Sequence, residues 1–166
     1  MNSRGRLGFT YTVEVESPDG TISQRETVHN LLPDEGIAHM LAVTFKGAAQ
    51  VPTWYIALYK GNYSPTAAIT AATFPALATE FTDYTPSARV EFNEGAVSGG
   101  ALNNGANRAE FTATADATVY GGVITSSSPK GSVTGVIASA VRFSSPKVLA
   151  TGDVLRVTAG VSLVSA

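Results

Sequence analysis

Phe9-Thr10-Tyr11-Thr12-Val13-Glu14-Val15 alternates apolar and polar side chains. This period of two predicts a β-strand with one buried and one solvated face, and it is unlike the continuous apolar core of a signal peptide. A second alternating stretch runs from Ile22 to His29, and the intervening Ser17-Pro18-Asp19-Gly20-Thr21 has the residues of a tight turn. The sequence therefore predicts an N-terminal β-hairpin with strands over 7–16 and 22–29.

The hairpin is not expected to be stable alone, because two strands bury too little apolar surface. The chain has 166 residues, which suits one domain with a full core. We expect residues 1–30, an N-terminal arm and the hairpin, to pack on a single β-sandwich domain over residues 31–166 or on a neighbouring subunit.

A single α-helix is predicted over residues 33–45. Pro33 suits the first helical turn, and Asp34 and Glu35 favour the positive end of the helix dipole. His39 is expected on the more polar side of this helix. The apolar face is predicted from residues at helical spacing: Ile37, Met40, Leu41 and Thr44 or Phe45.

The remaining chain is rich in short strands. Thr53–Tyr59 is dense in aromatic and branched side chains and apolar on both faces, which is typical of a central buried strand. Residues 64–78 are expected to be irregular with one helical turn, and the glycine-rich residues 94–107 to be a loop. Further strands are predicted at 80–84, 88–92, 109–113, 118–125, 133–143 and 153–164, with turn signals such as Ser144-Ser145-Pro146 between them.

This pattern predicts a mainly β fold: an antiparallel β-sandwich resembling a jelly roll, with one short α-helix (33–45) and the N-terminal β-hairpin.

The composition argues against several classes of function. Charged residues make up 14% of the chain, well below the roughly 25% of an average globular protein, and a low charge suits a protein docked on an assembly. The net charge of −2 argues against nucleic-acid binding, which requires a basic face. No run of apolar residues approaches a membrane span, so we expect no membrane partner.

No catalytic or metal-binding motif is evident. The chain has no cysteine, and its two histidines, His29 and His39, are not at the spacing of a helical metal pair. Glycoside hydrolysis would require carboxylates converging in a cleft, whereas solvated positions are the favoured interpretation for the candidates Glu80, Asp83, Glu91 and Glu94. The sequence predicts no enzymatic activity, no metal and no cofactor.

Three groups of segments carry a resemblance to a known class. They are Asn30–Ile37 before Trp54–Tyr59; Tyr63–Ala68 and Ala72–Phe74 before Glu80, Tyr84 and Arg89; and Val119–Ile124 before Ala138–Phe143 and Val154–Val161. In this order the chain resembles small virion structural proteins of tailed bacteriophages, the group that includes head-decoration or cement proteins with jelly-roll-like β-folds. The resemblance covers most of the chain from about residue 30 onward.

The resemblance implies a capsid decoration protein that binds and stabilises the assembled lattice of the major capsid protein. Its expected partners are that protein and other copies of itself, as a dimer or trimer, and its expected place is the capsid surface of the virion after synthesis in the host cytoplasm. The alternative is a tail or collar structural protein, or a receptor-binding (glycan-binding) sandwich with exposed aromatic side chains. The hairpin or the 95–107 loop is expected to reach a neighbour, through the candidate interface residues Arg4, Arg6, Phe9, Tyr11, Gly99, Asn103 and Asn104.

Overall fold

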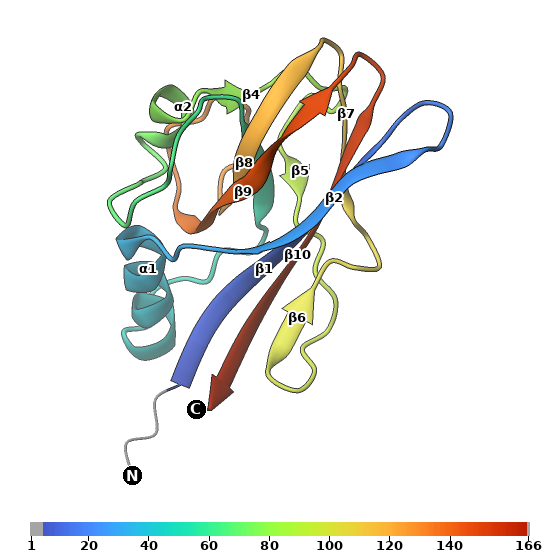
Figure 1. The fold of residues 1–166 in the computed structure, drawn as a ribbon. Coiled ribbons are helices and arrows are strands. Elements are labelled where there is room, and N and C mark those ends of the chain that lie inside the picture. The colour runs from blue at the N-terminus through green and yellow to red at the C-terminus, as the bar shows by residue number, and fades with distance from the viewer. Residues whose placement is uncertain (1–4, 166) are drawn as a thin grey trace.

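Two antiparallel sheets pack face to face in the computed structural model, which describes residues 5–165 (Figure 1). The first sheet has the order β2-β1-β10, and the short strands β6 and β7 pair with the other edge of β10. Its strands are β1 (Gly5–Glu16), β2 (Ile22–His29), β6 (Ala101–Asn103), β7 (Ala109–Thr112) and β10 (Val154–Ser165).

The second sheet has the order β4-β3-β8-β9, and β5 also pairs with β3. Its strands are β3 (Tyr55–Tyr59), β4 (Glu80–Phe81), β5 (Val90–Glu91), β8 (Ala117–Thr125) and β9 (Ile137–Leu149). Two helices, α1 (Asp34–Phe45) and α2 (Phe74–Leu77), complete the fold. The mainly β, antiparallel fold class predicted from the sequence is confirmed.

The predicted N-terminal hairpin forms and becomes part of the first sheet. β1 pairs with β2 from Thr10↔His29 to Glu16↔Ile22, and Gly20 supplies the positive φ of the turn. The opposite edge of β1 pairs with β10 from Gly5↔Ser165 to Glu16↔Val154. β1 therefore lies in the middle of a sheet that joins the two ends of the chain.

Strand alternation on β1 fixes the core as the sequence predicts. Every second side chain points between the sheets and is nearly inaccessible to solvent: Phe9, Tyr11, Val13 and Val15. The second sheet contributes Ile56, Leu58 and Ile124 to the same cluster. On the outer face of the first sheet, Thr12 lies between Thr27 and Thr158, so this part of the face is polar.

A second apolar cluster explains why β3 is apolar on both faces. Tyr59 and Ala57 point away from the main core, toward Val123 and the helix α2 residue Phe74. The Tyr59 and Phe74 rings meet edge to face with centroids 6.4 Å apart. The chain segment between β3 and β4 thus covers the outer face of the second sheet, and β3 is buried as predicted.

Two segments predicted as loop or turn contain strand residues. Residues 94–107 are not all loop, because Ala101–Asn103 pair with Gly160–Ser162 of β10. The turn predicted at Ser144-Ser145-Pro146 lies inside β9. From the pair Val119↔Lys147 to the pair Gly121↔Arg142, two residues of β8 are matched by five residues of β9. The extra residues form a bulge, a local irregularity that a long strand tolerates.

No helix in the described residues is long and apolar enough to cross a membrane.

Candidate interaction surface

Helix α1 is fixed to the second sheet on one flank only. Gly36 lies so close to β9 that a Cβ there would come within 2.6 Å of the Ile137 carbonyl oxygen. The Glu35 carboxylate accepts hydrogen bonds from the backbone N–H of Ala71 (3.0 Å) and of Ile137 (2.7 Å). These contacts decide which flank of the helix faces the body.

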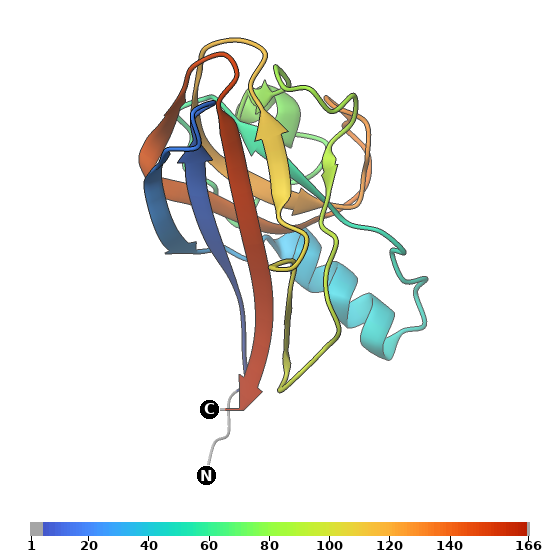
Figure 2. The same ribbon diagram turned by 90° about the vertical axis from the view of Figure 1, so that its right-hand side faces the viewer.

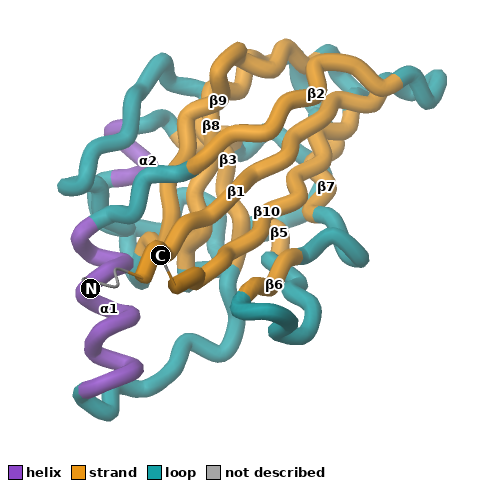
Figure 3. Tube along the Cα trace, turned by 60° about the horizontal axis from the view of Figure 1, so that its bottom comes forward, coloured by secondary structure: helices purple, strands orange, loops and turns teal. Residues whose placement is uncertain are grey.

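The opposite flank of α1 carries an uncovered apolar row. Ile37, Leu41 and Phe45 follow one another at i, i+4 spacing and are 40%, 53% and 78% exposed. In Figure 2 and Figure 3, α1 lies beside the strands rather than between them. The helical spacing predicts one apolar face that these residues share with Met40. This prediction is wrong, because the Gly36 contact turns Met40 inward and leaves the row outside.

The inward flank of α1 faces an aromatic residue. The His39 ring meets the Trp54 ring edge to face, with centroids 5.7 Å apart. His39 was expected on a more polar side, and this expectation is wrong because Trp54, just before β3, comes back beneath the helix.

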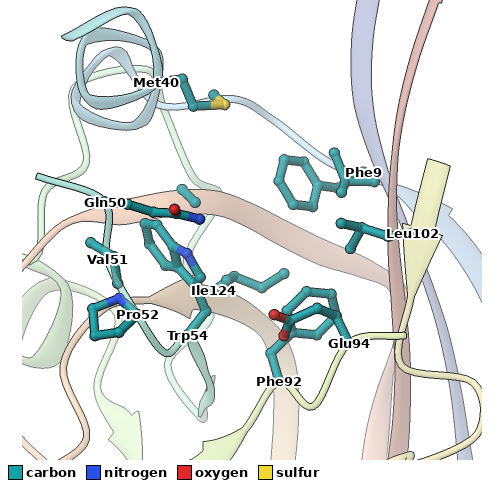
Figure 4. A pocket seen from close by; sticks show the side chains of 12 residues that line it. Phe9, Met40, Gln50, Val51, Pro52, Trp54, Phe92, Glu94, Leu102 and Ile124 are labelled. Atoms are coloured by element: carbon teal, nitrogen blue, oxygen red, sulfur yellow. The ribbon is translucent and has the colours of Figure 1, made fainter. Parts of the chain in front are cut away.

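A pocket of about 250 Å³ lies between α1, the chain before β3 and the open end of the sandwich (Figure 4). Aromatic side chains from separate parts of the chain line it: Phe9, Trp54 and Phe92. Aliphatic side chains and Met40 complete most of the wall, and the polar contributions come from Gln50 and Glu94. A concave, mainly apolar space with a few polar groups has the character of a small-ligand site.

The structure separates the candidate interface residues into buried and exposed groups. Phe9 faces the pocket, and Tyr11 is buried and donates a hydrogen bond to Ser139 Oγ at 2.8 Å. Asn104 is buried: its Nδ2 donates to the Val157 carbonyl and its Oδ1 accepts from the Ala159 N–H (3.2 and 2.8 Å). These three side chains hold the fold together and are not part of the exposed surface.

Gly99 and Asn103 are exposed, in the turn before β6 and at its end. Arg4 lies outside the described residues. The backbone of Arg6 pairs with Val164 in the first sheet, and the structure does not describe the Arg6 side chain. The hairpin was expected to present Phe9 and Tyr11 to a neighbour, but the second sheet covers the face on which they lie.

The candidate carboxylates are found in different surroundings. Glu80 was expected to be solvated, yet it is buried in an ion pair with Arg89. Asp83 pairs with Lys60 at 2.8 Å, and Glu91 and Glu94 are exposed. Among the described residues, no group of three or more His, Asp or Glu side chains is placed to hold a metal ion.

The exposure of the row on α1 and the presence of the pocket were not predicted from the sequence. A signal for the row was present, because apolar side chains on α1 occupy positions 37, 38, 40, 41, 42, 43 and 45 and span more than one stripe. No family model, curated protein or solved structure matches the chain.

Proposed function

We propose that this chain is a non-enzymatic virion protein of a tailed phage, a capsid decoration protein that docks on the assembled lattice of the major capsid protein through the outer flank of α1. The observation that carries the proposal is the row of Ile37, Leu41 and Phe45, held rigidly at the surface by the Gly36 and Glu35 contacts. Contiguous exposed apolar side chains mark protein–protein contact sites. The resemblance to head-decoration proteins supplies the identity of the partner.

The row by itself is too small for a lasting complex. Full burial of one such side chain contributes about 1.5–3 kcal/mol, and the three are already partly covered, so the row gains at most about 5 kcal/mol, whereas association costs about 4–15 kcal/mol. A second contact is therefore required, and the turn before β6 offers one. There Val97 (71% exposed) and Leu163 (62% exposed) are carried on segments joined by the Leu163 N–H to Gly100 carbonyl hydrogen bond of 2.8 Å.

The two contacts lie apart on the molecule, since α1 and β6 are separated in both Figure 1 and Figure 3. Two separated apolar contacts suit a protein that bridges neighbouring lattice subunits, because the second contact then forms at a high effective concentration. Binding only to the assembled lattice stabilises that state by mass action, without chemistry. Copies placed at equivalent lattice positions would also meet as the dimer or trimer that the resemblance implies.

The test is a binding measurement on purified heads that lack the chain. We expect saturable binding of the full chain in many copies per expanded head, and heads that resist heat better when decorated. Leu41→Glu should weaken binding at least tenfold, because it places a charge in the buried contact. Val133→Glu is the matched control, since Val133 is 56% exposed in the loop between β8 and β9 and should leave binding unchanged.

Several results would overturn the proposal: absence of binding to expanded heads, equal binding by the Leu41→Glu variant, or a few copies confined to tails. The last result would favour the tail or collar alternative. The glycan-binding alternative expected exposed aromatic side chains on a sheet face, and the threonine row Thr27, Thr12 and Thr158 does not favour it.

A further inference from the structure

We propose that the pocket beneath α1 binds an organic ammonium ion, that is, an amine carried on a short apolar chain or ring. This inference does not rest on the proposed function, since the pocket and the outer row of α1 are on different flanks of the helix. It rests on the charge and the aromatic character of the lining.

The aromatic rings come together from distant parts of the sequence. Figure 4 shows Phe9 of β1, Trp54 before β3 and Phe92 after β5 around one space, with Met40 of α1 above them. The face of an aromatic ring is electronegative, so several rings around one space favour a cation within about 6 Å of their centroids. The same rings disfavour an anion.

Glu94 provides a matching negative charge. It is the one charged residue among the twelve that line the pocket, and its N–H donates to the Phe92 carbonyl at 3.0 Å, which keeps it beside that ring. Among the residues whose side chains the structure describes (7–163), Glu94 has no basic partner, whereas Glu14, Glu16, Glu26, Glu80 and Glu110 each have at least one. A carboxylate at an aromatic pocket without its own cation is complementary to a cationic ligand.

The volume limits the apolar part of the ligand. An engineered apolar cavity of about 150 Å³ accepts benzene. The present pocket of about 250 Å³ therefore has room for a ring with a short chain, or for an alkyl chain of the lysine type. The ammonium group would lie near Glu94, beside the Phe92 ring, and the apolar body against Trp54 and Ile124 (Figure 4).

Trp54 is the only tryptophan of the chain, so its fluorescence reports on the pocket directly. The full-length protein is titrated with 2-phenylethylammonium, with neutral 2-phenylethanol and with anionic 3-phenylpropanoate. We expect the ammonium to bind roughly tenfold more tightly than the alcohol, as one cation–π or charge contact predicts, and the carboxylate to bind most weakly.

Glu94→Gln should remove the advantage of the ammonium over the alcohol while leaving the alcohol's affinity unchanged. Glu91→Gln is the matched control, because Glu91 is exposed on β5 and does not line the pocket. A thermal unfolding curve for each variant shows that it is folded. Equal affinities of the ammonium and the alcohol, an advantage that survives Glu94→Gln, or no saturable change in Trp54 fluorescence would overturn the proposal.

Two further probes, butylammonium and a blocked lysine, distinguish the source of the cation. A lysine blocked at both its backbone ends carries the same ammonium on a protein-like side chain. Binding as tight as that of butylammonium supports a lysine side chain of a partner protein as the ligand. Binding of butylammonium at least tenfold tighter than that of blocked lysine supports a free amine, and failure of both to bind contradicts an alkylammonium ligand.

Discussion

Arg89 and Glu80 form a two-point ion pair inside the protein, with Nη2 to Oε2 at 2.7 Å and Nε to Oε1 at 2.8 Å. Both side chains are almost completely removed from solvent. Arg89 also donates to the carbonyls of Ser127 and Ser132, and the Gly131 N–H donates to Glu80. The pair therefore ties the loop between β8 and β9 to strand β4.

Removing one partner of this pair should be costly. Arg89→Met leaves the Glu80 carboxylate buried without a counter-charge, and we expect a loss of about 3–5 kcal/mol in the free energy of unfolding. Urea unfolding of the variant measures it. The double variant Glu80→Leu/Arg89→Met should recover much of the loss, because apolar replacement of a complete buried pair is often close to neutral. A single variant as stable as wild type would contradict the role given to the pair.

Gly121 is expected to tolerate no side chain. A Cβ there would lie 2.1 Å from the Val141 carbonyl oxygen and 2.3 Å from the Tyr59 hydroxyl, which itself donates to that carbonyl. Gly121→Ala should therefore lower the free energy of unfolding by about 1–3 kcal/mol or more through overpacking. Gly8→Ala is the control, since a Cβ at Gly8 meets nothing within 4 Å, and its thermal midpoint should stay close to that of wild type.

The outer row of α1 should contribute to assembly but not to folding. Leu41→Glu changes a half-exposed side chain, so we expect a change within about 0.5 kcal/mol in the free energy of unfolding. Gly36→Ala should instead destabilise the chain, because its Cβ would meet the Ile137 carbonyl. Calorimetric unfolding of both variants tests the difference, and a Leu41→Glu variant that unfolds much earlier would show that this flank is part of the core.

Alkaline pH should destabilise the fold. Burial raises the pKa of the hydroxyls of Tyr11, Tyr59 and Tyr84 well above the usual tyrosine range. The folded-state pKa of each hydroxyl exceeds the unfolded value of about 10. The contribution of these protonated hydroxyls to the free energy of unfolding is therefore fully present below pH of about 10 and is lost as pH rises above it. Each such proton gives a slope of about 1.4 kcal/mol per pH unit.

Urea unfolding between pH 8 and pH 11 measures this loss. Burial lowers the pKa of Lys130, so the titration of this residue makes the fold more stable as pH rises. This is one group, against three tyrosines whose ionisation makes the fold less stable. In the Tyr11→Phe variant the free energy of unfolding should fall less steeply with pH, because one of the three ionising hydroxyls is absent. A free energy of unfolding that is unchanged or rises up to pH 11 would contradict the prediction.

Local patterns in the sequence determined the elements that depend on neighbouring residues. Alternation over Phe9–Val15 identified β1 and its buried face, and Pro18, Asp19 and Gly20 identified the turn to β2. The two apolar faces of Thr53–Tyr59 identified a buried strand. These predictions succeed because a strand's side-chain period and a turn's dihedral angles are set by the residues themselves.

The tertiary structure alone decided which segments meet. The pairing of β1 with β10 joins residues 5 and 165, and the short strand β6 exists because β10 offers an edge to Ala101–Asn103. The same holds for the buried Glu80–Arg89 pair and for the flank of α1 that Gly36 turns toward β9. Such contacts depend on which arrangement buries the most apolar surface and pairs the most polar groups over the whole chain, and no short stretch of sequence contains that balance.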